Sequence, residues 1–341
     1  MTSPNPAAPV TPQRLMQMAW GFAIPLILES AVKHRVFDVL AERPKTLDEI
    51  AHATGASRRG LRAILNTLVS VELLAKEGDR YKLTPESSAF LVSTKPGFQG
   101  AFLRHISTQL LPKWLQLNDI VATGKPAASV NQEGFGSEFF IQLVEDIYPM
   151  SAGAAAALAD HLFASVTGPA SVLDLAAGSG VWGIAAAKKS LLVSVTAVDW
   201  PTVIPVTKRV ADKHGVGDRF RYVPGDLLEA DFGTGHRLAT LGHILHSEGE
   251  ERSRKLLAKT FKALRPGGTI AIAEFVPDDD RCDPPAPLIF AVNMLVNTDT
   301  GDTYTFSEMS SWLREAGFEN VRQFPAPGPS PLILAERPGR S

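Results

Sequence analysis

The second half of the chain alternates short apolar runs with helical segments, and this alternation constrains the fold more than any other feature. We expect strands where apolar and β-branched residues cluster over four to six positions, with amphipathic helices between them. Strand and helix in regular succession are typical of a parallel sheet with helices on both faces. The expected strands are residues 171–175, 194–198, 220–224, 238–241, 269–274 and 332–335.

The length of 341 residues predicts more than one domain, because domains average about 150 residues. A proline-rich segment opens the chain, helical periodicity dominates the next part, and the strand pattern begins near Ala170. We therefore divide the chain into a disordered lead at 1–12, a winged-helix domain at 13–100, connecting helices at 101–165 and an α/β domain at 166–341.

The first domain shows the element order of a winged helix. Helical periodicity covers residues 13–40, with a kink or break at Pro25. Thr46 and Glu49 have the spacing of a capping box, and Ser57 is suited to cap the helix that follows. Residues 73–84 then alternate apolar and polar side chains around a turn, as a hairpin does.

The surface of this domain favours packing or dimerisation over reading DNA. The helix that Ser57 opens carries Arg58 and Arg62, but the helix before it is acidic, with Asp48 and Glu49, so no concentrated basic stripe forms. The apolar first helix, with Trp20 and Phe22, carries more apolar surface than a small domain can bury. We expect a second copy of the chain to cover it.

The composition argues against nucleic-acid-binding, disulfide-linked and membrane proteins. Lys and Arg total 34 against 36 Asp and Glu, a net charge of −2, so no overall positive field attracts nucleic acid or anionic lipid. The single cysteine, Cys282, excludes an intramolecular disulfide. Charges interrupt every apolar stretch, and the start of the chain lacks the pattern of a signal peptide. We expect a cytoplasmic protein without nucleic-acid or membrane partners.

A glycine-rich turn follows the first expected strand. Residues 172–183 read Val-Leu-Asp-Leu-Ala-Ala-Gly-Ser-Gly-Val-Trp-Gly, with Asp174 at the strand end and Gly178 and Gly180 in the turn. Glycines let a ligand approach the main chain and the amides of the helix N-terminus. Asp199 ends the next strand, where a carboxylate accepts both hydroxyls of a ribose. Asp226 follows the third strand and is placed to accept from an adenine amine.

The same turn argues against a dinucleotide. Ala176 stands where a dinucleotide site has its first glycine, and Asp174 would repel a pyrophosphate but can hold an ammonium group. S-adenosylmethionine has an ammonium, a ribose and an adenine, with a sulfonium between them. We therefore predict S-adenosylmethionine as the ligand.

These motifs resemble the class I S-adenosylmethionine-dependent O-methyltransferases with an N-terminal winged-helix dimerisation domain, a type found among plant small-molecule and bacterial natural-product enzymes. The resemblance extends from about residue 14 to 337. It is carried, in family order, by residues 174–180, 197–201, 224–226, 243–246, 264–275 and 312–318. It implies a Rossmann-like methyltransferase domain with a mostly parallel seven-stranded sheet, S-adenosylmethionine as cofactor, and a homodimer.

The resemblance also implies roles for individual residues toward the cofactor. Asp199 would bind the ribose, Asp226 the adenine, and the region of Gly178 the methionine part. Gly242 stands where plant members carry a lysine that contacts the cofactor, so that contact is missing. The full set of expected cofactor-binding residues is Asp174, Ala176, Gly178, Gly180, Asp199, Trp200, Asp226, Leu227 and Gly242.

The resemblance implies that His246 is the general base. An imidazole that titrates near pH 6.5 can take the proton of a hydroxyl as its oxygen attacks the methyl group. Glu274 matches a family carboxylate that orients this base, and Thr303 stands where a second acid normally flanks it. His243 is the competing base, and the alternative is that His246 and Glu274 are merely structural.

Acceptor contacts are expected from the middle helices and the segment after the fifth strand. Aromatic and methionine side chains suit a flat apolar acceptor. The residues that we expect to contact the acceptor are Trp114, Met150, Phe290, Met294 and Thr303, and the wider set of candidates adds Phe135, Phe140 and Met309. We expect no metal, although the acidic run 278–280 is an alternative site for a divalent ion.

We therefore predict a homodimeric enzyme that transfers a methyl group from S-adenosylmethionine to a hydroxyl of a small, aromatic or polyketide-like molecule. The alternatives are methyl transfer to a thiol or nitrogen, a cofactor-binding homologue with altered or lost transfer, and a winged-helix transcriptional regulator.

Overall fold

The computed structural model describes residues 10–126, 128–130, 133–328 and 331–339, and it does not describe the side chains of residues 133–135, 137 and 138. The chain divides into two compact units, Met1–Thr108 and Gln109–Ser341, and each is treated by itself below. Residues 1–9 of the expected lead lie outside the described part, as does the side chain of Phe135.

The first unit is built from short helices and a small sheet. Its described strands pair antiparallel in the order β1-β3-β2, and the hairpin β2–β3 confirms the alternation seen in the sequence. Its elements are α1 (Gln13–Ala19), α2 (Ala23–Lys33), α3 (Val36–Leu40), β1 (Lys45–Thr46), α4 (Leu47–Thr54), α5 (Arg58–Ser70), β2 (Leu74–Glu77), β3 (Arg80–Leu83), α6 (Pro85–Phe90) and α7 (Gly100–His105). A π-helical turn, Ile106–Leu110, follows α7.

The break in the first helical segment lies just before Pro25. Helix α1 ends at Ala19, and α2 begins at Ala23, so Pro25 sits in the first turn of α2. A proline is tolerated there because the backbone N–H it lacks would have no partner in the helix.

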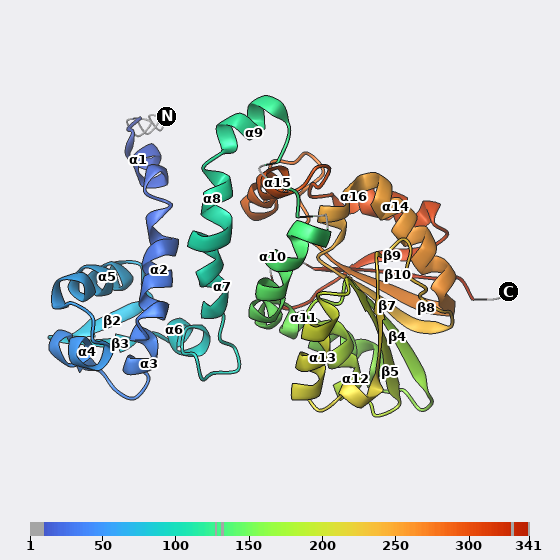
Figure 1. Ribbon diagram of the computed structural model, residues 1–341, viewed down its shortest axis with the longest axis horizontal. Coiled ribbons are helices and arrows are strands. Elements are labelled where there is room, and N and C mark those ends of the chain that lie inside the picture. Colours follow the sequence, from blue (N-terminus) through green and yellow to red (C-terminus); the bar gives the residue numbers. More distant parts are fainter. Residues whose placement is uncertain (1–9, 127, 131–132, 329–330, 340–341) are drawn as a thin grey trace, which may run out of the picture. The chain divides into compact units, whose positions relative to one another are not determined.

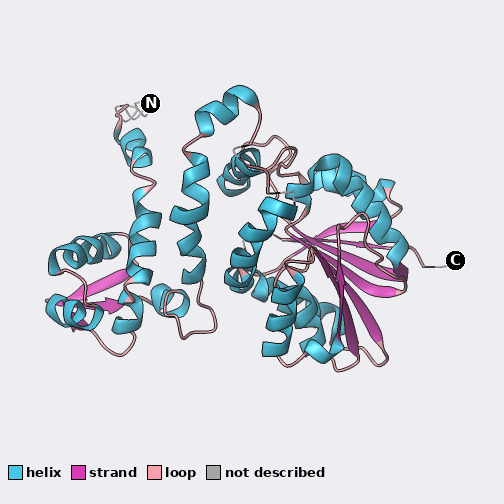
Figure 2. Ribbon diagram, viewed as in Figure 1, coloured by secondary structure: helices cyan, strands magenta, loops and turns pink. Residues whose placement is uncertain are grey.

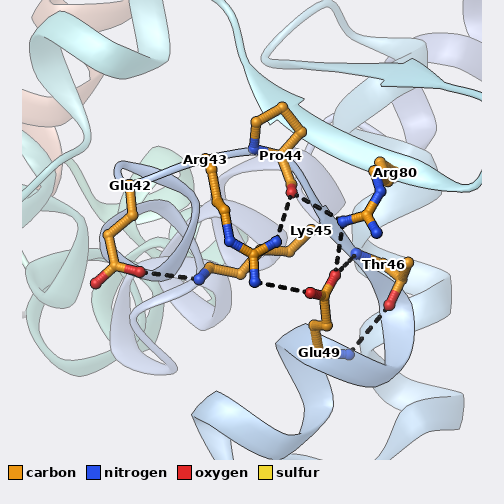
Figure 3. Close-up of polar contacts among 7 residues, drawn as sticks. All are labelled: Glu42, Arg43, Pro44, Lys45, Thr46, Glu49 and Arg80. Atoms are coloured by element: carbon orange, nitrogen blue, oxygen red, sulfur yellow. Dashed lines mark hydrogen bonds and ion pairs between the residues drawn. The ribbon is translucent and has the colours of Figure 1, made fainter.

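Glu49 ties helix α4 to the hairpin (Figure 3). Its carboxylate accepts from the backbone N–H of Thr46 at 2.7 Å, from Arg43 at 2.8 Å and from Arg80 of β3 at 3.0 Å. The Thr46 hydroxyl accepts from the Glu49 N–H, which completes the expected capping box. The Thr46 N–H and the two arginines together lower the pKa of Glu49 to about 2.

Helix α1 exposes most of its apolar side chains. Leu15, Met16, Met18 and Trp20 are 59 to 69% exposed. Within the described residues, no single helix has the length and apolarity to cross a membrane, although the bent pair α1 and α2 would meet that test by length and composition.

The second unit contains a large sheet with helices on both faces (Figures 1 and 2). In the described part of this unit, seven strands follow the order β6-β5-β4-β7-β8-β10-β9, and only β10 runs opposite to the other strands. The strands are β4 (Ala170–Leu175), β5 (Val193–Asp199), β6 (Phe220–Pro224), β7 (His236–Gly242), β8 (Leu264–Ala273), β9 (Glu319–Phe324) and β10 (Leu332–Glu336). The helices are α8 (Leu111–Trp114), α9 (Leu117–Thr123), α10 (Glu133–Asp146), α11 (Tyr148–Phe163), α12 (Val181–Lys189), α13 (Ile204–Lys213), α14 (Leu245–Ala263), α15 (Pro285–Asn297) and α16 (Phe306–Glu315), with a 3₁₀ turn at Gly217–Arg219.

Two apolar cores lie on the two faces of this sheet, because successive side chains of a strand point to opposite faces. Val172 of β4 packs in the core with α11, α12 and α13, whereas Leu173 and Leu175 pack in the core with α14 and α16. Figure 1 shows these two sets of helices on opposite sides of the strands. The mostly parallel α/β fold expected from the sequence is confirmed.

The apolar pattern of the sequence did not reveal strand β9, which is the seventh strand of the sheet that the resemblance implied. Its sequence, Glu-Asn-Val-Arg-Gln-Phe, is mostly polar, and it lies at the sheet edge with most side chains exposed. An edge strand that buries no complete face shows no apolar alternation, so the periodicity that reveals the inner strands is missing here.

Gly183 lets helix α12 lie directly on strand β5. A Cβ at this position would come within 2.6 Å of Val195 and 3.1 Å of the Asp174 carboxylate. We predict that Gly183→Ala lowers the free energy of unfolding by about 1–3 kcal/mol through overpacking, although alanine is the better helix former. Urea unfolding measures the change. Gly168→Ala is the control because its Cβ would meet no atom within 4 Å; equal stability of both variants would contradict the prediction.

Candidate active site

The glycine-rich turn after β4 has the backbone that its sequence requires. Gly178 and Gly180 have φ angles of 53° and 75°, a region that glycine enters without strain. Ala176 also has a positive φ of 49°, which is uncommon for a residue with a Cβ. Gly180 caps helix α12, so the turn delivers the N-terminus of that helix to the carboxyl edge of the sheet.

A cavity that is open to solvent lies at this edge. Its lining comes from the turns after β4, β5, β6 and β7 and from α10, α11 and the start of α14. This is where ligands bind in open α/β sheets, next to the point where the strand order reverses. The predicted residues that line it are Ala176, Gly178, Asp199, Trp200, Asp226, Leu227, Gly242 and His246. Asp174, Gly180 and Glu274 do not line it.

Asp199 is held by the backbone at the end of β5. One carboxylate oxygen accepts from the Gly178 N–H and the other from the Trp200 N–H, both at 2.7 Å. Burial raises the pKa of Asp199 to about 6, against the lowering effect of these two hydrogen bonds. The carboxylate is thus fixed beside the glycine turn with its remaining lone pairs available to a ligand.

Asp226 is held by a network that the sequence analysis missed. It accepts from the Leu228 N–H at 2.8 Å and from Arg252 at 2.7 Å. Arg252 also donates to Glu248 at 2.6 Å, and burial raises the pKa of Glu248 despite this contact. The i,i+4 spacing of Glu248 and Arg252 was a usable signal for their pairing, but nothing in the sequence placed Asp226 beside them.

Asp174 has a structural position rather than a place on the cavity wall. It has no exposed surface, and its carboxylate accepts from the Gly183 N–H at 2.9 Å and from the Thr240 hydroxyl at 2.7 Å. Burial raises its pKa to about 7. The carboxylate links β4 to helix α12 and to β7, and it does not reach the cavity in which we expected it to hold an ammonium group.

His246 and Glu274 form a buried pair. His246 Nδ1 lies 2.7 Å from a Glu274 carboxylate oxygen, and the His246 N–H donates to the other oxygen at 3.3 Å. Burial alone would raise the pKa of Glu274, but the charge and hydrogen bonds of His246 hold it below its ordinary value. An ionised Glu274 fixes the Nδ1–H tautomer, so Nε2 of His246 is the acceptor that remains.

His243, the competing base, also lines the cavity but has a different environment. Its backbone is left-handed, with φ of 60°, and its Nδ1 is enclosed without a hydrogen-bond partner among the described residues. Burial lowers the pKa of His243 to about 4. An imidazole with so low a pKa is a weak base, which favours His246 for proton transfer.

Trp182 fills the place that a side chain at position 242 would occupy. A Cβ on Gly242 would lie 2.0 Å from the indole Nε1 of Trp182. The indole is 6% exposed and lines the cavity. The resemblance indicated that position 242 lacks the lysine of plant members. Trp182 lies 60 residues earlier in the chain, and nothing in the sequence indicated that its indole would occupy the space of that side chain.

Of the expected acceptor residues, Phe290 lies beside His246. The two rings meet edge to face, with centroids 4.9 Å apart. Further along the same helix, α15, Asn293 accepts from the indole N–H of Trp114 at 3.1 Å, and Met294 is buried. Phe290 and Met294 thus belong to α15, and Trp114 of α8 is hydrogen-bonded to the same helix.

The remaining expected acceptor residues are distributed over several places. Thr303 is fully buried in the segment whose Asp302 N–H donates to the His246 carbonyl at 2.9 Å. Met150 lines a second, smaller cavity rather than the main one. Phe140 lines the main cavity and packs against Trp200. Met309 was a wrong candidate, because α16 buries it completely in the core on one face of the sheet.

The acidic run 278–280 does not form a convergent set of ligands. Asp279 accepts from the Ser307 hydroxyl at 2.6 Å, and Asp280 accepts from the Cys282 N–H. Over the residues that the structure describes, His243, His246 and Glu274 instead bring three ligand atoms within 4.8 Å of one another. The 2.7 Å contact within that group is the hydrogen bond of the His246 pair.

Comparison with known proteins agrees with this site. The sequence matches the O-methyltransferase dimerisation domain over residues 16–93 and the O-methyltransferase domain over residues 114–319. It is 29% identical to the tetracenomycin polyketide synthesis 8-O-methyl transferase TcmO of Streptomyces glaucescens, covering 96% of this chain and 97% of that protein.

Solved structures show the same fold. A protein from Nostoc punctiforme superposes with a TM-score of 0.88 at 27% identity, over 96% of this chain and 100% of that one. PigF of Serratia, solved with S-adenosylhomocysteine, superposes with a TM-score of 0.80 at 25% identity, over 96% of this chain and 100% of that one.

The chain belongs to the O-methyltransferase family, whose members use S-adenosylmethionine as methyl donor. It is therefore an enzyme of the transferase class, with a dimerisation domain before its catalytic domain.

Thr240 tests the structural role of Asp174. We predict that Thr240→Val, which keeps the shape but removes the hydroxyl, lowers the free energy of unfolding by about 1–3 kcal/mol, because a buried carboxylate oxygen loses its donor. Thr260→Val is the matched control: this threonine is equally buried, but its hydroxyl donates to a carbonyl within helix α14. Chemical denaturation of both variants gives the comparison, and an equal cost would remove Asp174 from this role.

Proposed function

We propose that the cavity binds S-adenosylmethionine, with the ribose hydroxyls on Asp199, the adenine near Asp226 and Leu227, and the methionine part along the turn at Gly178. The observation that carries the proposal is the placement of Gly178, Asp199 and Asp226 by three neighbouring turns on the wall of one cavity. Trp200 and Ala176 complete the proposed contacts. Gly180 does not line the cavity, and we assign it the N-cap position of α12. The sequence predicted that Asp174 contacts the ammonium group of the ligand. We assign it instead a role in supporting the turn.

The polar groups of the cavity fit this molecule. Asp199 has lone pairs left after its two backbone hydrogen bonds. The buried Leu227 offers an apolar surface to a flat base, and Asp226 beside it is an acceptor for an exocyclic amine. When bound, the cofactor supplies a methyl group activated by a sulfonium charge.

We propose His246 as the general base and Glu274 as the residue that positions it. Glu274 holds the Nδ1–H of His246, so the Nε2 lone pair faces away from the carboxylate and can accept a proton. Nε2 of His246 would take up the proton of the acceptor hydroxyl when that hydroxyl reacts with the bound cofactor. The buried carboxylate then stabilises the imidazolium, as an adjacent negative charge favours a cation.

We propose a hydroxyl of a small aromatic or polyketide-like molecule as the acceptor. The ring of Phe290 at the edge of His246 offers an apolar face to such a molecule. Trp114, Met294 and Thr303 lie on the segments around it, and we assign Met150 a secondary place because it lines the smaller cavity. The similarity to TcmO, whose name places it in tetracenomycin polyketide synthesis, supports this acceptor class.

We propose that the enzyme is a cytoplasmic homodimer that binds neither nucleic acid nor membrane. The exposed apolar side chains of α1, in the region matched by the dimerisation domain, support the dimer. Arg58 pairs with Asp48 at 2.5 Å, and Arg80 pairs with Glu49 at 3.0 Å, so these two basic side chains of the winged-helix unit already have acidic partners within it.

The ribose assignment predicts a loss of binding in Asp199→Asn. An amide accepts fewer hydrogen bonds and presents a donor to the ribose hydroxyls, so affinity for S-adenosylhomocysteine should fall at least about tenfold. Isothermal titration calorimetry measures it. In the wild type, affinity should also fall as the pH drops below about 6, where Asp199 takes up a proton. The asparagine variant should lack this pH dependence, and unchanged affinity in the variant would remove the assignment.

The base assignment predicts that His246→Gln lowers turnover by about 10²-fold or more and leaves S-adenosylhomocysteine affinity unchanged. Turnover is followed as formation of S-adenosylhomocysteine with a panel of hydroxylated aromatics. Full activity in this variant would transfer the role to His243 or to no base at all.

A further inference from the structure

The turn that carries His246 is separated from the rest of helix α14 by Gly249. The backbone of Gly249, with φ of 78° and ψ of 164°, lies in a region that is essentially restricted to glycine. Two carbonyl groups before this break accept from donors outside their own turn. The Leu245 carbonyl accepts from the Ser253 hydroxyl at 3.2 Å, and the His246 carbonyl accepts from the Asp302 N–H at 2.9 Å. The base therefore lies on a short turn that other parts of the chain hold in place.

The N–H donor to the His246 carbonyl belongs to residues 300–303, a segment that packs tightly against this turn. A Cβ on Gly249 would lie 2.4 Å from the Thr300 hydroxyl oxygen, and a Cβ on Gly301 would lie 2.4 Å from the His246 carbonyl oxygen. Both distances are far below those of van der Waals contact, since nonbonded carbon atoms pack at about 3.5–4.0 Å. The contact therefore requires one glycine on the turn and another on the segment.

This segment is held at both ends. Before it, the Thr298 hydroxyl accepts from the Gly301 N–H at 2.9 Å and donates to the Met294 carbonyl of α15 at 2.7 Å. At its other end, Arg281 donates to the Thr303 carbonyl at 2.7 Å. The N–H group that reaches the base is therefore fixed from both directions.

The main chain of the segment, and not its side chain at 303, contacts the base. The Thr303 hydroxyl is buried and has no hydrogen-bond partner among the described residues. Glu274 accepts from the ring and from the backbone N–H of His246. The segment binds the remaining polar group of this residue, its backbone carbonyl. His246 is thus held from two sides by different parts of the chain.

We propose that Gly249 and Gly301 are positioning residues for His246, because their close contacts let the 300–303 segment hold the backbone of the base while Glu274 orients its ring. This inference rests on the proposed role of His246 as the base. A side chain at either glycine would push the segment away from the turn and move the imidazole relative to the acceptor. A misplacement of about 1 Å at a reacting group can lower a rate by about 10²-fold.

Gly249→Ala and Gly301→Ala test this role with two measurements. We expect each variant to lower turnover with the hydroxylated aromatics at least about tenfold, while affinity for S-adenosylhomocysteine changes less than about twofold. The second measurement is the proton NMR signal of the His246 Nδ1–H. The hydrogen bond to Glu274 moves this signal downfield, and His246→Gln identifies it by its absence. The signal should shift or disappear in both variants, and it requires neither cofactor nor acceptor.

Two other glycines provide matched controls. Gly267 has a positive φ of 70°, and a Cβ there would meet no atom within 4 Å, so Gly267→Ala has the strain of an alanine at positive φ without a collision. Gly168 and Gly301 both lie outside the positive-φ region, and a Cβ on Gly168 would also meet no atom within 4 Å. Gly168→Ala is therefore the control for Gly301→Ala. Both controls should keep the NMR signal and the turnover of the wild type.

Thr298→Val is a milder variant that decides the question if the two alanine variants do not fold. It removes the hydroxyl that holds the Gly301 N–H, so it should lower turnover about threefold and shift the same NMR signal. Thr260→Val, its control, should change neither.

The possible outcomes separate this inference from the function on which it rests. If the His246 signal and the turnover stay as in the wild type, or if affinity for S-adenosylhomocysteine falls as far as turnover, the two glycines do not position the base and the proposal is overturned. If the wild type transfers no methyl group, the proposed function fails, and the NMR comparison alone supports or overturns the positioning role.

Discussion

The catalytic unit depends on one carboxylate that has no contact with solvent. Asp174 at the end of β4 accepts from the first turn of α12 and from the Thr240 side chain of β7. These elements flank the glycine turn, so the carboxylate fixes the positions from which the turn begins and ends. Burying this group is costly, as its raised pKa shows, and the two donors offset part of that cost. With both ends fixed, the turn holds one conformation although Ala176, Gly178 and Gly180 have positive φ angles.

Around this support, three side chains at the cavity are each positioned by hydrogen-bond partners within the protein. Gly178 and Trp200 hold Asp199, Arg252 holds Asp226, and Glu274 holds His246. A ligand group that enters the cavity therefore meets acceptors and donors whose orientation is already set, and little reorganisation is needed when it binds. The base lies on the same edge of the sheet because His246 follows β7 and Glu274 follows β8.

The sequence predicted best those parts of the fold that obey a local rule. The inner strands alternate buried faces, the capping box of Thr46 satisfies two backbone donors, and the glycine turn needs its positive φ angles, so each left a readable pattern. Strand β9 left none, because an edge strand with polar side chains buries no face. Asp174 and Met309 were misjudged for a related reason. Sequence shows that a side chain is acidic or apolar, but whether it turns to the cavity or to the core depends on packing between distant elements.

Because Trp182 contacts Gly242, substitutions at these two positions depend on each other. Any enlargement at 242 collides with the indole, so a variant that restores a long cationic side chain there must first, or at the same time, acquire a smaller residue at 182. Single-site mutagenesis of position 242 will therefore show only losses, and a library that varies both positions together is the one able to exchange an indole for a lysine.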